Sequence, residues 1–453
     1  MRVLLMDPPQ LFLTGSGATR QVQPLGLAYV GAYVASDHAV RFLLPDTRSY
    51  TGETPWEELA TAISAERPDV VGLTAVTATY GSACRVAELV KAVCPEAVVV
   101  LGGVHATAEP VASLQGCGSI DYVVKGEGEV TFAALLAGLG SGAGFDPATV
   151  EGLAYRDAVG AVVQTANRPS IQDLDALPVP LRDHLVWPQD IQPAFYQAMV
   201  TLRGCPYRCI YCAVPSSSNR LTRYRSAARV VEEIEELRGR WGIPYLFFHD
   251  SVFTLHRERT VAICEGMLAR GGPLPFACQT RADRVDAELL DLMKEAGCHQ
   301  IFFGIESGDV GSLKLIRKKM ELETIRTAVA LVKARGIRCT GFFMVGFPWE
   351  TEALIDTTVD FACELDLDAV SLFSATPLPG TELWELAGGA SMPGSIDFRT
   401  PQVNLTRMDD AAYQALYARA QTRVDAYNQA QMIKQFEATM AAQGLAQRSW
   451  LDG

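Results

Sequence analysis

Three cysteines stand close together in the segment LRGCPYRCIYC, residues 202–212. They are Cys205, Cys209 and Cys212, with three residues between the first two and two residues between the last two. A structural zinc site takes four ligands, and no second Cys-x-x-Cys pair follows to complete one. A redox pair of the thioredoxin type uses two thiols, so it gives the first cysteine no role.

Three thiolates on one short loop suit a cluster of four irons and four sulfides. Such a cluster takes one protein ligand per iron, so three cysteines leave one iron open for another molecule. Gly204 and Pro206 shape the loop on which the thiolates converge. The plain alternative is a chance grouping of buried thiols. The segment follows an expected barrel strand, where α/β barrels build their sites, and this position favours the cluster.

The composition is that of a large, acidic protein. The chain has 453 residues, a formal net charge of −13 and 49% hydrophobic residues, which predicts two or three domains with real cores. An acidic chain without a basic tract is a poor candidate for nucleic acid or an anionic membrane. The N-terminus, MRVLLMDPPQ, is too interrupted for a signal peptide, and no apolar run is long enough to span a membrane. We therefore expect a cytoplasmic protein whose eight other cysteines are reduced and mostly buried.

Residues 1–145 alternate short apolar strands with helical patterns, and they are expected to form one domain. Continuous apolar strands separated by helices indicate a parallel sheet covered on both faces. Ligands of such sheets bind beyond the carboxyl ends of the strands. Glycines there either admit a bulky ligand close to the backbone or only make tight turns. The expected strand ends are Asp7–Pro9, Asp46, Thr74–Thr79, Gly102–His105 and Gly126–Glu129.

A second strand–helix alternation follows a linker. Residues 146–193 are rich in proline and polar residues and contain an expected hairpin, whereas residues 194–382 predict six strands with five intervening helices. Six units are too few for a complete eight-fold barrel, so we expect an open, partial (β/α)6 barrel. Residues 383–453 have a helical pattern and are expected to form a cap or an interface. Polar residues collect at the expected carboxyl ends of the barrel strands, at Cys205–Cys212, His249–Ser251, Gln279–Arg281, Glu306–Ser307, Pro348 and Thr376–Pro377.

The segment CPYRCIYC resembles the Cys-x3-Cys-x2-Cys signature of the radical S-adenosylmethionine (SAM) superfamily. Further segments resemble the subfamily that carries a cobalamin (B12)-binding domain, among them PLGLAYVGAYV, VVLGGVHAT, VVKGEGE, FFHDSVFT, FFGIESG and GFFMVGFPWET. The resemblance covers roughly residues 1–385. It implies an α/β fold with a Rossmann-like (flavodoxin-like) cobalamin-binding-type domain, the partial radical SAM barrel and a C-terminal helical segment.

The resemblance implies that the three cysteines ligate the cluster and that its open iron binds the amino and carboxylate groups of SAM. Tyr211 matches an aromatic position near the adenine, and Asp250 with Ser251 matches the strand end that holds the SAM amino group. Arg281 is expected near the SAM carboxylate, and Glu306 matches a residue that contacts the ribose. Structural alternatives are a helix cap for Asp250 and a buried ion pair between Glu306 and Arg281.

The resemblance also bears on a second cofactor. Gly102, Gly103, Gly126 and Glu127 belong to the loops that would face cobalamin. The chain lacks the Asp-x-His-x-x-Gly sequence by which many cobalamin domains supply a histidine to cobalt. Much of the subfamily lacks this sequence too. Cobalamin therefore either binds without that ligand, or it is absent and the domain is a scaffold.

The implied chemistry is reductive cleavage of SAM to a 5′-deoxyadenosyl radical, which abstracts hydrogen from an unactivated carbon. We expect a small polar substrate, with radical dehydration or deoxygenation of an aminosugar in antibiotic biosynthesis as the favoured outcome. This expectation follows the compact length, which resembles the radical diol dehydratase of aminoglycoside (apramycin) biosynthesis. The alternatives are cobalamin-dependent C-methyl transfer and ring rearrangement.

Partners follow from the same chemistry. The enzyme needs an external electron donor of the flavodoxin or ferredoxin type, and a partner reductase acting on the product would suit a dehydration. A reading of a different class is a non-catalytic iron–sulfur sensor or redox relay. Relays usually saturate their clusters with four cysteines, so the open iron favours an enzyme.

Overall fold

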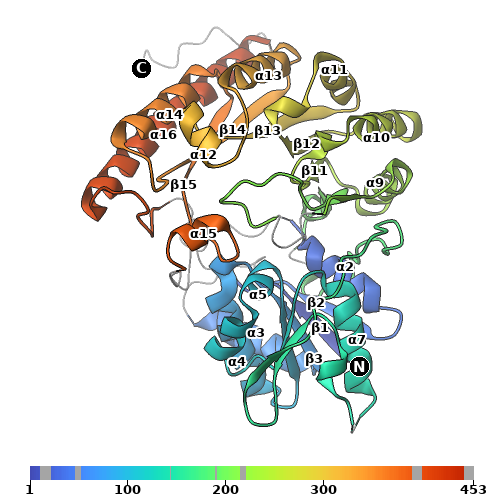
Figure 1. Cartoon of the computed structure of the whole chain (residues 1–453). Helices are drawn as coiled ribbons and strands as arrows, with labels where there is room; N and C mark the ends of the chain where they lie inside the picture. Colours follow the sequence, from blue (N-terminus) through green and yellow to red (C-terminus); the bar gives the residue numbers. More distant parts are fainter. Residues whose placement is uncertain are drawn as a thin grey trace, which may run out of the picture. The chain divides into compact units, whose positions relative to one another are not determined.

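The computed structural model describes residues 1–10, 22–45, 53–142, 144–188, 191–214, 221–389 and 400–442. The chain divides into two compact units (Figure 1). The first comprises Met1–Ser251, Glu265–Leu274 and Pro377–Asp397, and the second comprises Val252–Cys264, Pro275–Thr376 and Phe398–Gly453. The predicted domain boundaries near residues 145, 193 and 382 stay predictions, and the expected strand end at Asp46 lies outside the described residues.

The first unit contains a seven-stranded sheet with strand order β2-β1-β3-β4-β5-β6-β7. Its first five strands are parallel, as their continuous apolar runs predict: β1 (Arg2–Met6), β2 (Ala39–Leu43), β3 (Val70–Thr74), β4 (Val98–Gly102) and β5 (Tyr122–Val124). The predicted hairpin, β6 (Leu153–Arg156) and β7 (Val162–Gln164), pairs antiparallel with β5 and extends this sheet. The sequence predicts the hairpin as part of a linker, because the hairpin residues alone do not show that they pair with the edge strand of this sheet.

Helices cover both faces of this sheet, with α2 and α7 on one side and α3 and α4 on the other (Figure 1). Successive strand side chains point to opposite faces, so Leu4 and Met6 pack in the core with α3 and α4. Leu5, Gly72 and Val100 therefore face α2 and α7. The helices of this domain are α2 (Leu25–Val34), α3 (Thr54–Glu66), α4 (Tyr80–Val93), α5 (Val104–Ala108), α6 (Pro110–Gly116) and α7 (Gly128–Gly140).

The first unit also contains the start of the barrel region. The barrel strand expected just before the cysteine segment is split into two short strands. The first, β8 (Ala198–Met199), pairs in parallel with β11 (Leu246–Phe248), and the second is β9 (Leu202–Arg203). Strand β9 pairs antiparallel with β10 (Arg223–Tyr224), a short ribbon that the sequence pattern does not reveal. Helix α9 (Ala227–Trp241) begins at a Ser226 cap and ends at Gly242 in the left-handed conformation. The short helix α15 (Glu382–Leu386) belongs to the same unit.

The second unit contains four parallel strands that are neighbours in chain order. The strands are β12 (Phe276–Thr280), β13 (Cys298–Glu306), β14 (Arg338–Val345) and β15 (Ala369–Ser374). The side chains of β15 alternate between buried and half-buried, whereas those of β12 are buried except for Gln279. The helices are α11 (Ala287–Glu295), α12 (Val310–Leu315), α13 (Leu322–Ala334), α14 (Glu352–Glu364) and α16 (Asp410–Ala442), and α10 (Arg257–Arg270) is shared between the units.

Helix α16 closes the free edge of β15 (Figure 1). The Asn428 amide both donates to the Val370 carbonyl and accepts from its N–H, each at 2.8 Å, as a neighbouring strand would. The Tyr417 hydroxyl donates to the Leu372 carbonyl at 3.2 Å. These side chains provide hydrogen-bond partners for backbone groups on the edge of β15 that would otherwise be unpaired.

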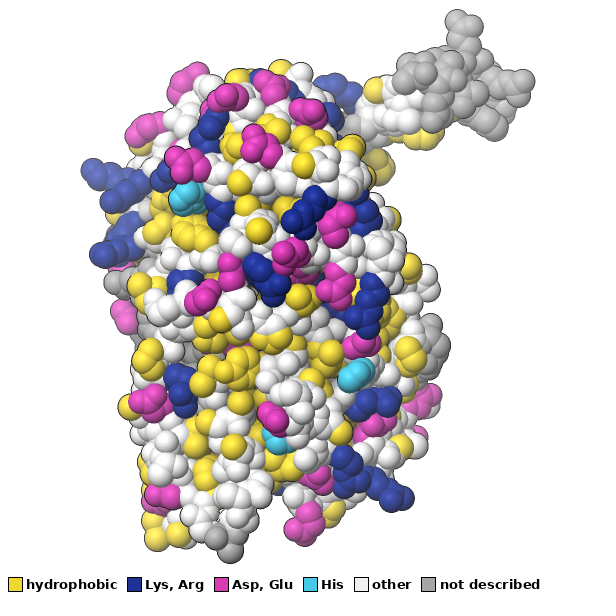
Figure 2. Space-filling view, turned by 90° about the vertical axis from the view of Figure 1, so that its right-hand side faces the viewer, with side chains coloured by type: hydrophobic (Ala, Val, Ile, Leu, Met, Phe, Trp, Pro, Cys, Tyr) yellow, Lys and Arg dark blue, Asp and Glu magenta, His cyan; other side chains and the backbone are white. Residues whose placement is uncertain are grey.

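Charges of both signs are interspersed on the face shown in Figure 2. Within the described ranges, no helix combines the length and the hydropathy that a bilayer span requires.

Candidate cofactor site

The cysteine loop, Gly204–Val214, follows β9 directly. Gly204 has a φ of +89°, a left-handed conformation that favours glycine and turns the chain out of the strand. The backbone N–H of Cys212 donates to the Cys209 carbonyl at 3.2 Å, which folds the second half of the loop into a turn. From α15, the Leu383 N–H donates to the Ile210 carbonyl at 2.9 Å. The start of the predicted C-terminal cap therefore braces the loop that carries the cysteines.

The three thiols of the loop, one for each of three irons, are a donor set that fits a four-iron cluster. Cys205 is buried, whereas Cys209 and Cys212 are half-buried, as is Tyr211 between them. Among the described residues, no three His, Cys, Asp or Glu side chains converge as one metal ion requires. A four-iron cluster gives each thiolate its own iron, so its ligands need not meet at one point. All eleven cysteines are described and none forms a disulfide, so the three sulfur atoms are not crosslinked.

Asp250 holds the strand that leads into the cysteine loop. The residue is 1% exposed, and its Oδ1 accepts the backbone N–H groups of Thr201 at 2.7 Å and Leu202 at 2.9 Å. Oδ2 accepts the Thr201 hydroxyl at 2.5 Å. These hydrogen bonds tie the end of β11 to residues just before the cysteines, a role that differs from the helix cap considered as an alternative. The neighbouring Ser251 is exposed.

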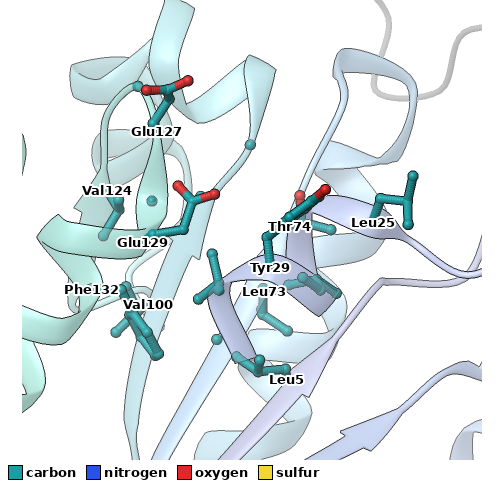
Figure 3. Close-up of a pocket in the computed structure, with 18 of the residues that line it drawn as sticks. Leu5, Leu25, Tyr29, Leu73, Thr74, Val100, Val124, Glu127, Glu129 and Phe132 are labelled. Carbon is teal, nitrogen blue, oxygen red and sulfur yellow. The ribbon is translucent and has the colours of Figure 1, made fainter. Parts of the chain in front are cut away.

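A cavity of about 280 Å³ lies at the carboxyl ends of β1, β3 and β4, between α2 and α7 (Figure 3). Gly72 helps to create it, because a Cβ atom there would stand 2.7 Å from the Leu5 side chain. Figure 3 shows Leu5 and Phe132 deep in the cavity and Glu127 and Glu129 at the opposite end. The cavity therefore has an apolar interior and a charged rim, which is typical of sites for large organic ligands.

The predicted cobalamin-loop residues Gly102, Gly103, Gly126 and Glu127 all line this cavity. Gly103 is required by its turn, because its φ is +94° and a Cβ atom would stand 2.6 Å from the Ala75 carbonyl oxygen. Gly126 has a φ of +75°, and a Cβ atom there would meet no described atom within 4 Å. Both glycines therefore have a backbone conformation that suits a tight turn, and Gly126 also has open space beside its backbone.

A second cavity, of about 250 Å³, adjoins the first. Its lining combines Thr107, Gly126 and Glu127 of the N-terminal domain with Gly204 and Val214 of the cysteine loop. Arg203 and Arg223 complete the wall, and Arg203 lines both cavities.

Arg203 connects the N-terminal cavity to the cysteine loop. Its guanidinium donates to Glu127 at 3.2 Å and to Glu129 at 2.5 Å, and its Cζ lies 5.0 Å from the centre of the Tyr29 ring. Arg223 donates to the other Glu127 oxygen at 2.8 Å. The sequence identifies Glu127 but misses both arginines, because a buried arginine looks like a surface arginine until its partner is known.

Two groups of this arginine–glutamate network, Glu127 and Arg203, have pKa values that favour their charged forms. Burial raises the pKa of Glu127, but the hydrogen bond from Arg223 and the charge of Arg203 outweigh it, so the net pKa is below its usual value. Burial lowers the pKa of Arg203, but the charge of Glu129 outweighs it, so the net pKa is above its usual value. The network therefore holds compensating charges beside an apolar cavity.

Arg281 and Glu306 lie in the second unit, where Lys318 contacts both. Glu306 Oε1 accepts from Lys318 Nζ at 2.9 Å, and Arg281 donates to the Lys318 carbonyl at 2.9 Å. The Arg281 guanidinium forms a two-point ion pair with Asp283, both contacts at 2.8 Å. In the structure, Glu306 is therefore paired with Lys318 and Arg281 with Asp283.

The backbone of Glu306 is strained. Its φ is +76°, and the register between β13 and β14 shifts between Gly304 and Glu306. Non-glycine residues rarely adopt such a φ, and those that do concentrate at functional sites. The shift re-aims the side chain at the carboxyl end of its strand.

The chain is similar in sequence to known proteins over most of its length. Residues 199–362 match the family model of the radical SAM superfamily, and residues 16–136 match that of the B12 binding domain. An uncharacterized methyltransferase of Pyrococcus horikoshii is 34% identical over 394 residues, which are 85% of this chain and 83% of the relative. An anaerobic magnesium-protoporphyrin IX monomethyl ester cyclase of Rubrivivax gelatinosus is 29% identical over 394 residues, covering 86% of this chain and 70% of the relative.

Solved structures extend the likeness to the fold. The structure of the radical SAM methyltransferase TsrM from Kitasatospora setae, with cobalamin and a 4Fe–4S cluster bound, has a TM-score of 0.71. Its sequence identity is 21%, and the match covers 92% of this chain and 85% of that one.

The chain therefore belongs to the radical SAM superfamily, in the subfamily that carries a B12-binding domain. The family resemblance drawn from the cysteine motif and the α/β fold class are confirmed. Membership makes the chain a radical SAM enzyme, with a 4Fe–4S cluster and SAM as its cofactors. Such chemistry also requires an electron donor.

Proposed function

We propose that this chain is a cobalamin-dependent radical SAM methyltransferase, which transfers a methyl group to an unactivated carbon of a small molecule. One observation carries the proposal: the apolar cavity of the B12-type domain and the cysteine loop lie in one compact unit, and Arg203 lines the cavity and directly precedes the loop in the chain. When bound, cobalamin supplies a methyl carrier, and the cluster with SAM supplies the radical.

The residues divide this work between them. The three cysteines hold the cluster. Gly126 leaves the backbone open to a flat ring, and the apolar end of the cavity near Leu5 and Phe132 accepts an apolar group. Asp250 keeps the cysteine loop in place through Thr201 and Leu202. We further propose SAM contacts for the residues that match family positions, namely Tyr211, Asp250, Ser251, Arg281 and Glu306.

Methyl transfer replaces radical dehydration as the favoured outcome. The relative at 34% identity is named a methyltransferase, and none of the three proteins compared above is named a dehydratase. A dehydration does not require cobalamin, so it gives the apolar cavity and its open glycine no role. Ring formation is the second candidate, because one relative is named a cyclase and would use the same cofactor domains. The flavodoxin- or ferredoxin-type electron donor remains part of the proposal, whereas a reductase acting on the product belongs to the dehydration alternative.

The test is anaerobic reconstitution of the cluster with and without hydroxocobalamin, followed by desalting and incubation with methyl-deuterated SAM and a reductant. We expect equimolar retention of the corrinoid, transfer of the labelled methyl group to it, and release of S-adenosylhomocysteine. Cleavage of SAM to 5′-deoxyadenosine without retained corrinoid would overturn methyl transfer and restore dehydration. Retained corrinoid that takes up no label would favour ring formation.

A further inference from the structure

Three phenylalanine rings form a row on one face of the sheet in the second unit. Phe302 of β13, Phe342 of β14 and Phe373 of β15 are each half-buried. The ring centres of Phe302 and Phe342 lie 5.6 Å apart, and those of Phe342 and Phe373 lie 6.0 Å apart. Met344, also half-buried, is in register with Phe373 and extends the row on the same face. Together these four side chains form an aromatic row.

The aromatic row is partly accessible, unlike the side chains that alternate with it. Phe303, Phe343 and Leu372 point to the opposite face of the sheet and are at most 4% exposed. Met344 and Phe373 each lie one residue before the end of their strand, so the row reaches the carboxyl edge at which α/β barrels bind ligands. Contiguous apolar side chains that stay accessible often mark a binding site, and aromatic rings favour planar ligands because they stack.

Two neutral polar side chains border the aromatic row. Gln279 of β12 is in register with Phe302, and Ser371 of β15 is in register with Phe342, so both lie on the same face. Neither side chain makes a hydrogen bond to another described residue, and the polar ends of both remain within reach of solvent. A ligand on this face therefore meets one amide and one hydroxyl, which can both donate and accept hydrogen bonds.

The carboxylate beside the row is already paired. Gly304 is in register with Phe342, and a Cβ atom on Gly304 would stand 2.7 Å from Glu306 Oε1 and 2.9 Å from Lys318 Nζ. The ion pair of Glu306 and Lys318 therefore lies on this face, beside Phe342. Because Lys318 already neutralises this carboxylate, the face suits a neutral planar ring better than a cationic aminosugar.

We propose that the aromatic row binds the methyl-accepting substrate, and that this substrate presents a planar aromatic or conjugated ring with neutral hydrogen-bonding groups. The inference rests on the proposed function, because it takes a small-molecule methyl acceptor as the ligand. The ring packs on Phe342, which is the centre of the row, and its polar groups bind Gln279 and Ser371. Such a substrate differs from the aminosugar expected from the sequence.

The test compares Phe342→Leu with Phe436→Leu in anaerobic, cluster-loaded protein that contains SAM. Leucine keeps the side chain apolar but removes the ring. Phe436 is the matched control, because it lies on α16, outside the sheet, and is 64% exposed. The probes are indole and 2-naphthol, which are planar and carry one donor each, and glucosamine, which is a cationic aminosugar. By isothermal titration calorimetry, we expect the dissociation constants of both planar probes to rise about fivefold or more in Phe342→Leu and to stay unchanged in Phe436→Leu.

Several outcomes overturn the inference. One is wild-type protein that binds neither planar probe, or that binds glucosamine more tightly than both. Another is equal affinity of the planar probes for wild type and Phe342→Leu. A weaker affinity for SAM in Phe342→Leu, with the planar probes unaffected, assigns the row to the adenine of SAM instead.

The proposed function is tested separately from the substrate. Transfer of the labelled methyl group to cobalamin requires no substrate, so its failure in wild-type protein rejects the proposed function whatever the probe titrations show. Should Phe342→Leu not fold or retain iron, Phe373→Leu replaces it, because it removes the neighbouring ring of the same row. The same weakening of planar-probe binding is expected, and unchanged binding again overturns the inference.

Discussion

Glu350 offers a test of the second unit that needs no cofactor. This residue follows β14 and is 2% exposed. Oε2 accepts the backbone N–H groups of Gly346 at 2.6 Å and Phe347 at 3.0 Å, whereas Oε1 has no partner among the described residues. Burial raises the pKa of this carboxyl from 4.5 to about 7. We predict that Glu350→Gln stabilises the protein at pH 8 and changes little at pH 5.

The magnitude follows from the two pKa values. Because the folded protein holds the Glu350 proton more tightly than the unfolded chain, the stabilisation from that proton is complete below pH 4.5. It is lost progressively as the pH rises to about 7. The interval between the two pKa values corresponds to about 3 kcal/mol in the free energy of unfolding. Glutamine stays neutral throughout and keeps an oxygen for the two N–H groups, so it avoids this loss.

The assay is urea unfolding of cluster-free wild type and variant between pH 5 and pH 8. We expect the free energy of unfolding of Glu350→Gln, relative to wild type, to rise across this range by up to about 3 kcal/mol. Glu437→Gln removes an exposed carboxylate on α16 and controls for the change in net charge. A stability difference for Glu350→Gln that does not vary with pH would refute the reasoning.

Three further variants test the first unit. Cys209→Ser is expected to lose cluster iron and the cleavage of SAM. Cys94→Ser changes a cysteine outside the cysteine loop and is expected to keep both. Formation of 5′-deoxyadenosine by Cys209→Ser would contradict the assignment of Cys209 as a cluster ligand. Asp250→Asn leaves buried donors without a full acceptor, so we expect about 1–3 kcal/mol less stability and less iron per chain, read by thermal unfolding and iron assay. Gly126→Ala places a methyl group in the open space of the cavity and should weaken cobalamin binding. Gly160 has a similar positive φ in an exposed hairpin turn. Gly160→Ala should therefore strain the backbone to the same extent without weakening cobalamin binding.

Contiguous features of this chain were predictable from sequence, and long-range pairings were not. The apolar run over residues 2–6 predicts β1 (Arg2–Met6), because a buried parallel strand must be continuously apolar. The spacing of the three cysteines likewise indicates an iron–sulfur cluster, because all three expected ligands lie on one short loop. By contrast, Glu129 pairs with Arg203 across 74 residues, and no local pattern encodes that contact. The hairpin is a second example. Its turn is formed by residues that are close in sequence and could be predicted, whereas its pairing with β5 could not.

The arginine–glutamate network beside the cysteine loop is better explained by positioning than by stability. Burying charges removes their hydration, and their mutual attraction often does no more than offset that cost. Glu129 lies in the first turn of α7, where the helix dipole favours a negative charge, and it holds Arg203 two residues before Cys205. Arg203 also lines both cavities, so a ligand in either one meets the same guanidinium. An apolar replacement of this network could preserve the fold, but it would leave nothing to set the cysteine loop against the cofactor cavity.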